Sequence, residues 1–462
     1  MSGLASLPRE ILGEIFLYAD LQCRKELRLT CGTLATIGKG WVFRDTVVSL
    51  EDESYNRLEN ILADPSLVQC VTTVCLNVSK WNEEDVDYDE QSEHGDEAAE
   101  WSALPERFRA LFHRLGELPR LQGVSLCFDE ACADSDDWHI QVPQSQAFRS
   151  VVLRKLMTLL VSLPQLPQGL TLHNLHNINE SEESAVADIT QVLGALRSLR
   201  LNIVHQEDGN DDFDFDSTNP HEFFTALPSF WLNPAASNLE HLTIYSNLFY
   251  GFFPKLNLQG VHFPRLKSLA FGNYEFVHDS QLDWILSHGS TLTQLYLDNC
   301  HILFEVAIDC PEKTYLEPRV FERREGLPSQ DRWASYGTRW HHYFRAFNEG
   351  LPLLRKFGFG CTSWLDLDHA HGNATTLTLG MGEECYAVFN DAYGPPYPLD
   401  SHMKYMTSIE GSEDQEYRDE APLIPSEEDR QALGDLYRRI GQPFSPDMTY
   451  DLEEMVIGSH WS

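Results

Sequence analysis

The chain has 462 residues, of which 42% are hydrophobic, and its 34 basic and 71 acidic side chains give it a formal net charge of −37. The apolar content excludes a disordered chain and predicts a globular core. The negative charge repels phosphate backbones and anionic lipid headgroups, which argues against nucleic acid and membrane surfaces as partners.

The sequence contains none of the usual features of a secreted or membrane-spanning protein. Residues 1–10 lack a basic segment followed by a long apolar run. No stretch approaches about eighteen consecutive apolar residues, the length that a spanning helix requires. The ten cysteines are scattered and form no CxxC pair, which is typical of reduced, buried thiols. We therefore expect an intracellular protein of the cytoplasm or the nucleus.

Three short helices are predicted within residues 4–45. Pro8 suits the first turn of a helix over about residues 8–18. The apolar residues of this helix form one stripe, namely Ile11, Leu12, Ile15 and Phe16. A second helix is predicted over about residues 22–30, and a third contains Leu34 and Ile37. Three helices of this size bury little apolar surface, so the rest of the chain or a partner is expected to cover part of it.

The residue pattern of this segment resembles an F-box, particularly the divergent form found in many fungal proteins. Two runs carry the resemblance, Leu7-Pro8-x-Glu10-Ile11-Leu12-x-x-Ile15-Phe16 and Leu27-Arg28-Leu29-Thr30-Cys31. The segment departs from the family at Cys23 and Arg24, where Asp-Leu is usual, and at Leu34, where Trp is usual. The resemblance implies docking on a Skp-type adaptor, and through it on a cullin, by Leu7, Pro8, Ile11, Leu12, Ile15 and Leu27. The alternative is a helical cap that closes the array of repeats described next.

A motif with apolar residues at its first, fourth and sixth places recurs through residues 46–370. The clearest copies are Leu239–Asn247, Leu266–Asn273 and Leu292–Asn299, whose final asparagines lie 26 residues apart. This interval is typical of leucine-rich repeats, in which alternate side chains of a short strand point inward and the asparagine bonds to backbone groups at the turn. Weaker copies bring the predicted strands to eight, centred on Val74, Val124, Leu170, Leu199, Leu242, Leu269, Leu295 and Phe357.

Helical patterns lie between these strands, at about residues 55–62, 108–115, 152–160, 189–196 and 282–286. The alternation predicts an α/β fold with parallel strands on one side and helices on the other, as in a leucine-rich-repeat-like solenoid. The copies lie between 26 and 62 residues apart, which implies insertions. An unrelated α/β fold with leucine-rich strands is the alternative, and the regular asparagine spacing favours the repeats.

Acidic segments follow three of the predicted strands, at residues 83–90, 129–137 and 207–216. If all three leave from the same edge of the sheet, they form a negative rim that steers a basic partner. The alternative is a set of solvated loops with no binding role.

The C-terminal part of the chain follows the repeat pattern less closely. A helix capped by Ser329 is predicted to pack over the last repeats, and its aromatic stripe is Trp333, Tyr336, Trp340, Phe344 and Phe347. Residues 371–462 are predicted as a C-terminal extension, with one capped helix from Ser426 to Ile440.

Motifs of the common enzyme classes are missing from the sequence. It has no Walker loop, no strand-linked GxGxxG, no GxSxG elbow and no HExxH. His341-His342 and His369-x-His371 are too few ligands for a metal site. We therefore expect neither a cofactor nor catalysis in this chain.

The resemblance and the repeats together predict the substrate-recognition subunit of an SCF-type (Skp–cullin–F-box) ubiquitin ligase. Two alternatives remain, a leucine-rich-repeat scaffold that acts outside any ligase and a hydrolase with a closed pocket on an α/β fold. Residues between the inward-pointing leucines should face the target, with Tyr and Arg as the expected anchors. These residues are Arg200, His241, Thr243, Tyr245, Gln294, Tyr296 and Asp298.

Overall fold

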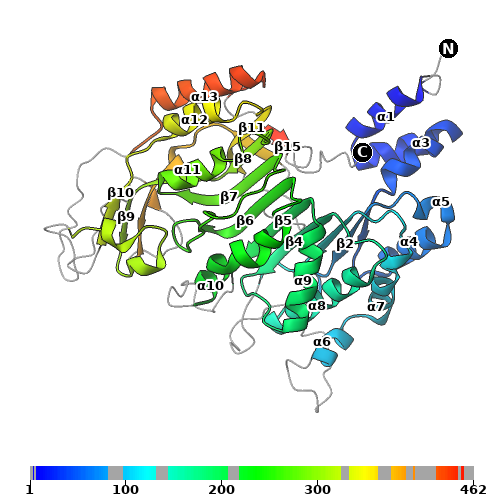
Figure 1. Ribbon diagram of the computed structural model, residues 1–462. Coiled ribbons are helices and arrows are strands. Elements are labelled where there is room, and N and C mark those ends of the chain that lie inside the picture. The colour runs from blue at the N-terminus through cyan, green and yellow to red at the C-terminus, as the bar shows by residue number, and fades with distance from the viewer. Residues whose placement is uncertain are drawn as a thin grey trace, which may run out of the picture. The chain divides into compact units, whose positions relative to one another are not determined.

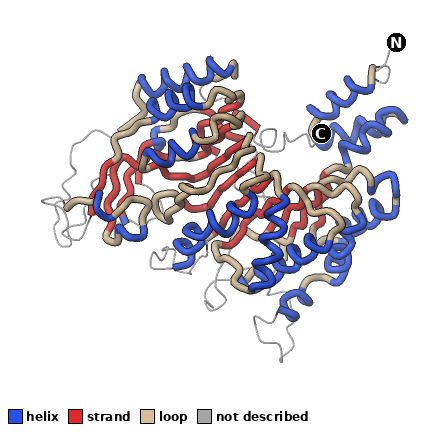
Figure 2. The backbone as a smooth tube through the Cα atoms, in the orientation of Figure 1, coloured by secondary structure: helices blue, strands red, loops and turns tan. Residues whose placement is uncertain are grey.

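The computed structural model shows an α/β fold in which helices accompany a mostly parallel sheet (Figures 1 and 2). It describes residues 4, 7–81, 97–131, 144–205, 218–323, 332–362, 376–391, 399–400, 423–445 and 449–451. The predicted acidic segments 83–90 and 207–216, most of the segment 129–137, Ser329 and the His369-x-His371 group lie outside these residues.

The chain divides into two compact units. Unit 1 comprises Met1–Asp129 and Val142–His173, and unit 2 comprises Glu130–Gln141 and Asn174–Ser462. The N-terminal helices belong to unit 1, and the described strands beyond residue 370 belong to unit 2. The domain boundaries at residues 45 and 370 stay a prediction.

Unit 1 begins with three helices and continues with parallel strands that alternate with further helices. Its elements are α1 (Arg9–Tyr18), α2 (Leu21–Thr30), α3 (Gly32–Val42), β1 (Asp45–Val48), α4 (Asp52–Ala63), α5 (Pro65–Val68), β2 (Thr73–Asn77), α6 (Glu97–Ala103), α7 (Glu106–His113), β3 (Gly123–Cys127) and α8 (Gln146–Ser162), followed by β4 (Gly169–His176), whose last residues belong to unit 2. All three predicted N-terminal helices are present, as are those at 55–62, 108–115 and 152–160.

The strands of unit 1 pair in parallel in chain order, from β1 to β4. Val74 stands opposite Val124, and Val124 stands opposite Leu170, so the predicted strand centres form one row. All three side chains are at most 1% exposed, because they point from the sheet into the core. β1 extends this row at Thr46 and was not predicted.

Unit 2 continues the alternation of strands and helices. Its larger elements are α9 (Glu183–Ala195), β5 (Ser198–Val204), α10 (Thr218–Leu227), β6 (His241–Tyr250), β7 (Ser268–Phe276), α11 (Asp279–Leu286), β8 (Gln294–Asp298), β9 (His301–Ile308), β10 (Arg332–Ser335), α12 (Trp340–Gly350), β11 (Lys356–Thr362), β12 (Thr376–Leu379), β13 (Tyr386–Asn390), β14 (Leu399–Asp400), α13 (Glu427–Ile440) and β15 (Thr449–Asp451).

The central strands of unit 2 lie side by side in the order β5, β6, β7, β8 and β11, all parallel (Figure 1). Their predicted centres again form one buried row, which consists of Leu199, Leu242, Leu269, Leu295 and Phe357. The prediction that these distant segments pair as neighbouring strands is therefore confirmed. β12 and β15, two strands of the predicted C-terminal extension, extend this sheet in antiparallel pairing.

The asparagines bond only in part as predicted, because Asn247 and Asn273 lie within β6 and β7, and Asn299, which follows β8, donates to a side chain. Asn273 and Asn299 both adopt left-handed backbone conformations, with φ of 57° and 50°. Asn273 Nδ2 donates to the Ser246 carbonyl at 2.7 Å, and Asn299 Nδ2 donates to Asn273 Oδ1 at 2.7 Å. Since Tyr245 stands opposite Gly272, Asn247 lies one residue beyond Asn273 in register. It accepts instead from the backbone amide of His205 at 3.1 Å.

The predicted helix capped by Ser329 was wrong in its first half. Trp333 lies in β10, where it stands opposite Ala307 of β9 and is 2% exposed. The spacing of Trp333, Tyr336 and Trp340 imitates a helix, but cross-strand pairing with β9 buries Trp333 more completely than a lone helix could. The helix α12 begins only at Trp340.

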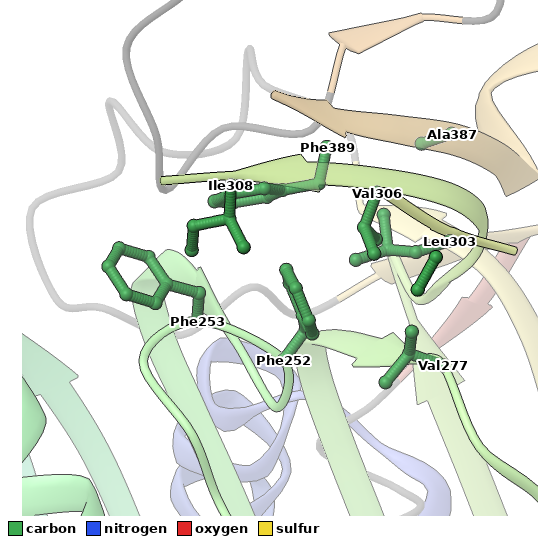
Figure 3. Close-up of a cluster of buried hydrophobic side chains, with 9 residues drawn as sticks. Phe252, Phe253, Val277, Leu303, Val306, Ile308, Ala387 and Phe389 are labelled. Atoms are coloured by element: carbon green, nitrogen blue, oxygen red, sulfur yellow. The ribbon is translucent and has the colours of Figure 1, made fainter. Parts of the chain in front are cut away.

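A second group of strands contains the antiparallel pair β9–β10 and the parallel pair β9–β13. Its core contains Phe252 and Phe253, which follow β6, together with Ile308 of β9 and Phe389 of β13 (Figure 3). This core had no counterpart in the repeat pattern, because its strands come from the insertion before β11 and from beyond residue 370.

Tyr245 lies directly against the backbone of β7 at Gly272. A Cβ atom added to Gly272 would lie 2.1 Å from Tyr245 Cδ2. We expect Gly272→Ala to destabilise the protein by about 1–3 kcal/mol, because the ring must leave its position. In a Tyr245→Ala background the same substitution should cost well under about 1 kcal/mol. Urea unfolding of the wild type, the two single variants and the double variant measures the cost of Gly272→Ala with and without the Tyr245 ring.

Gly434 of α13 provides the matched control for this prediction. A Cβ there meets nothing within 4 Å, so Gly434→Ala should stabilise the helix by about 0.5–1 kcal/mol. An equal cost of Gly272→Ala with and without the Tyr245 ring would contradict the proposed overlap.

Candidate functional site

The N-terminal helices α1–α3 have a small core of their own. Leu12 and Phe16 lie four residues apart on α1 and are both 0% exposed, and they pack against Leu34 of α3. Arg24 of α2 donates from Nε to the Phe16 carbonyl at 2.7 Å and thereby caps the end of α1. Arg24 is one of the residues at which the segment differs from the F-box pattern.

The start of α2 is fixed by a conventional cap. Asp20 accepts from the backbone amide of Cys23 at 2.8 Å, as an N-cap side chain does. The hydrogen bond from the Cys23 side chain and that from its backbone amide lower the pKa of Asp20. Cys23, a second residue that differs from the F-box pattern, thus donates its backbone amide to the cap.

The opposite side of these helices exposes apolar side chains. Among the described residues, ten large hydrophobic side chains are exposed, and six of these lie within the first thirty residues, namely Leu4, Leu7, Ile11, Tyr18, Leu21 and Leu29. Ile11 and Tyr18 are seven residues apart and therefore share one face of α1, away from Leu12 and Phe16. An exposed apolar face of this kind is a candidate surface for contact with another protein.

The predicted adaptor-binding residues separate into three groups by exposure. Leu7, Pro8 and Ile11 are exposed, and Leu7 and Ile11 expose 40% and 47% of their surface. Ile15 and Leu27 are partly buried against the small core. Leu12 is 0% exposed, so it supports the module from inside and does not reach a partner.

The first helix was predicted to carry one apolar stripe, but its apolar side chains form a buried face with Leu12 and Phe16 and an exposed face with Ile11. Tyr18, Leu21 and Leu29 were missed, although Tyr18 follows Ile11 by seven residues and this helical spacing was visible in the sequence. Exposed residues of α2 had no comparable signal, because a helix with few apolar residues shows no clear stripe.

The segment also differs in charge from the rest of the chain. Residues 4–45 hold six basic and five acidic side chains, whereas the whole chain holds 34 and 71. A partner that docks on the exposed face of α1 therefore meets a nearly neutral surface, where apolar contact is not opposed by strong charge repulsion.

The predicted target-binding residues of unit 2 lie on one side of the sheet. Arg200 stands opposite Thr243, whose row continues through β7 to Tyr296 of β8. His241 and Gln294 share the preceding row. These positions alternate with the buried leucines, as expected for side chains on the other face of a sheet.

Two of these seven residues are buried and present no contact surface. Tyr296 is 1% exposed, and Asp298 is 9% exposed. The Asp298 carboxylate accepts from the backbone amide of Thr362 at 2.8 Å and from the Thr362 hydroxyl, and so it ties β8 to the end of β11. Burial raises the pKa of Asp298 to about 6 despite these bonds. The other five, Arg200, His241, Thr243, Tyr245 and Gln294, are partly exposed.

The histidine pair at 341–342 has a structural role. His341 Nδ1 lies 2.8 Å from Asp429 Oδ1 of α13, and the His341 backbone amide donates to the same oxygen. Within the described ranges, no group of three or more His, Cys, Asp or Glu side chains is arranged to hold a metal ion. A cavity of about 10 Å³, lined in part by Tyr274, Gln281 and Trp284, has room for a water molecule and is too small for a substrate.

The fold and these surfaces define an α/β protein with a mostly parallel sheet and an exposed apolar face on its N-terminal helices. A comparison with known protein families finds no match, and a search of the curated proteins also finds none. The resemblance of residues 4–45 to an F-box therefore stays a prediction. In the part of the chain that the structure describes, no helix combines the length and the apolar character needed to cross a membrane.

Proposed function

We propose that this chain is the substrate-recognition subunit of an SCF-type ubiquitin ligase. Residues 4–45 would act as an F-box-like module that binds a Skp-type adaptor, and a leucine-rich-repeat-like solenoid would hold the target protein. The observation that carries the proposal is the exposed apolar surface at α1, where Leu7 just before the helix and Ile11 within it belong to the F-box-like run.

The two-faced character of α1 supports this assignment over a simple helical cap. A cap that only closed the array would bury its apolar side chains against the neighbouring strands. Ile11 and Tyr18 instead remain 47% and 75% exposed while Leu12 and Phe16 fill the small core. Leaving such side chains in water costs free energy that contact with a partner would recover.

The repeat-like part of the proposal is supported by the row of buried strand centres. Copies 26 to 62 residues apart in sequence stand in one register within unit 2. Their alternate residues form a face with partly exposed Thr243 and Tyr245, the kind of surface on which repeat proteins bind other proteins. In this proposal the chain positions a target, and other subunits transfer ubiquitin.

The adaptor contact is tested by changing exposed residues only. We expect a Leu7→Asp/Ile11→Asp variant to lose at least about tenfold of the Skp-type adaptor that co-purifies with the wild type, because apolar anchors dominate such interfaces. Both side chains are exposed, so the fold of the module should survive and its circular dichroism should not change.

Leu353→Asp is the matched control, since Leu353 is 44% exposed and lies in unit 2. It should retain the adaptor fully. Absence of the adaptor from the wild-type protein, under conditions where a known F-box protein retains it, would refute the ligase assignment. It would favour a scaffold that acts outside a ligase.

A further inference from the structure

A row of basic side chains follows the amino-terminal edge of the sheet in unit 2. The row consists of the residue that lies two places before the buried centre of each strand. In each of these residues after the first, the backbone amide donates to the carbonyl of the corresponding residue before the previous strand, so all of them occupy equivalent positions. From β5 to β11 these residues are Arg197, Glu240, Lys267, Thr293 and Arg355, and Lys356 follows directly at the start of β11. We call Arg197, Lys267, Arg355 and Lys356 the basic strip.

The basic strip is open to solvent. The side chains of Arg197 and Lys267 are 49% and 54% exposed, and Arg355 and Lys356 are exposed as well. Glu240 is the acid within the row, and it is 16% exposed and pairs with Lys267 at 2.6 Å and with Arg197 at 3.7 Å. The Glu240 carboxylate thus pairs with two cations. The basic strip and Glu240 together carry a net positive charge, whereas the whole chain has a net charge of −37.

The position itself does not require basic residues. In unit 1 the equivalent backbone bonds join Arg44, Thr72, Gln122 and Gln168, and the last three of these residues are neutral. The same backbone ladder therefore forms at these three places without cations. Concentrating exposed positive charge at one edge of an acidic protein calls for an explanation beyond folding.

The spacing of the cations fits an extended peptide. Arg197, Lys267 and Arg355 lie on every second strand, and adjacent strands are about 4.8 Å apart, so successive cations start about 10 Å apart. Three residues of a polyproline-II segment cover about 9.3 Å, which returns every third side chain to the same side. Acidic side chains at every third position would therefore meet successive cations.

We propose that the basic strip binds an acidic peptide segment with carboxylates at every third residue, running across the strands. This inference rests on the proposed function only in assigning the segment to the target protein. A nucleic acid fits less well, because its continuous phosphate charge meets repulsion from the rest of the chain. A peptide with few charges approaches the strip at smaller electrostatic cost.

The test is fluorescence anisotropy with two synthetic peptides of equal composition. One has glutamates at every third position among alanines and prolines, and the other has its glutamates adjacent. We expect the full-length protein to bind the spaced peptide more tightly, with affinity that falls as salt is raised. A Lys267→Gln/Arg355→Gln variant should bind it about fivefold to tenfold more weakly.

The control variant is Arg57→Gln/Lys80→Gln, which removes two exposed basic side chains from unit 1. It should bind the spaced peptide as the wild type does. Equal losses in both variants, equal affinity for both peptides, or tighter binding of a single-stranded oligonucleotide would each overturn the proposal. Adaptor binding is not involved, so failure here leaves the ligase assignment standing, and failure of that assignment leaves peptide binding measurable.

Discussion

Replacing Asp429 with alanine is expected to destabilise the attachment of α13 to α12 by about 3 kcal/mol or more, because it leaves buried donors without an acceptor. The carboxylate is 2% exposed and accepts four hydrogen bonds of 2.8–2.9 Å. Two come from Ser426, at the start of its own helix, and two come from His341 of α12. Hydrogen exchange of the first amides of α12 measures the loss.

The pH dependence of this contribution follows from the pKa of Asp429. Burial alone would raise this pKa, but the hydrogen bonds from Ser426 and His341 hold it below its ordinary value of 3.8. Because the folded pKa is depressed, the contribution is present above about pH 3.8 and is lost as the pH falls through the folded value. The difference between wild type and Asp429→Asn should therefore shrink in acid.

Asp435 supplies the control on the same helix. Its carboxylate pairs with Arg438 at the surface, and its side chain is 45% exposed. Asp435→Ala should leave the exchange of the α12 amides unchanged, because solvent screens an exposed pair. A similar effect of the two substitutions would contradict the capping role of Asp429.

Glu275→Gln is expected to remove a contribution to the pH dependence of stability by which the wild type loses stability as the pH rises toward 8. Glu275 lies in β7 and is 0% exposed. Its Oε2 accepts from the Phe253 amide at 3.4 Å, and its Oε1 has no hydrogen-bond partner among the described residues. Burial raises the pKa of this carboxyl from 4.5 to about 8. The folded protein therefore holds a proton that the unfolded chain releases.

The raised pKa sets the direction of the effect. Below pH 4.5 the carboxyl is protonated in both states, and between 4.5 and about 8 only the folded state keeps the proton, so stability falls as the pH rises. At pH 8 Glu275→Gln should be more stable than the wild type by on the order of a few kcal/mol. Urea unfolding at pH 5, 6, 7 and 8 gives both slopes.

Glu349→Gln, at an exposed position of α12, should reproduce the wild-type slope. If Glu275→Gln also had the wild-type slope, the carboxyl would have to be ionised in the folded protein, and the proton would not be held there.

The pairing of the strands could be predicted because every strand centre is a large apolar residue at a fixed place in a short motif. Leu242, Leu269 and Leu295 are each 0–1% exposed and stand in one row. The strand β10 could not be predicted in this way, since Trp333 and Trp340 fall at a spacing that also suits a helix. Pairing with β9 makes this segment a strand and not a helix, and a local sequence pattern carries no information about such tertiary pairing.

The candidate surfaces were predicted in part. The exposed positions of Leu7 and Ile11 were expected from the F-box resemblance, whereas the burial of Leu12 depends on packing against Leu34, twenty-two residues away. The basic strip was not visible in the sequence, because Arg197, Lys267 and Arg355 are far apart in the chain and fall into one row only through the strand register.

The uneven intervals between strand centres show which connections the buried row accommodates. The connection from Leu269 to Leu295 spans 26 residues, whereas that from Leu295 to Phe357 spans 62 and contains β9, β10 and α12. Doubling the length of a flexible loop adds only about 0.6 kcal/mol to its closure cost. A short connection and one more than twice as long are therefore compatible with the same buried row, and the longer one has room for strands and a helix of its own.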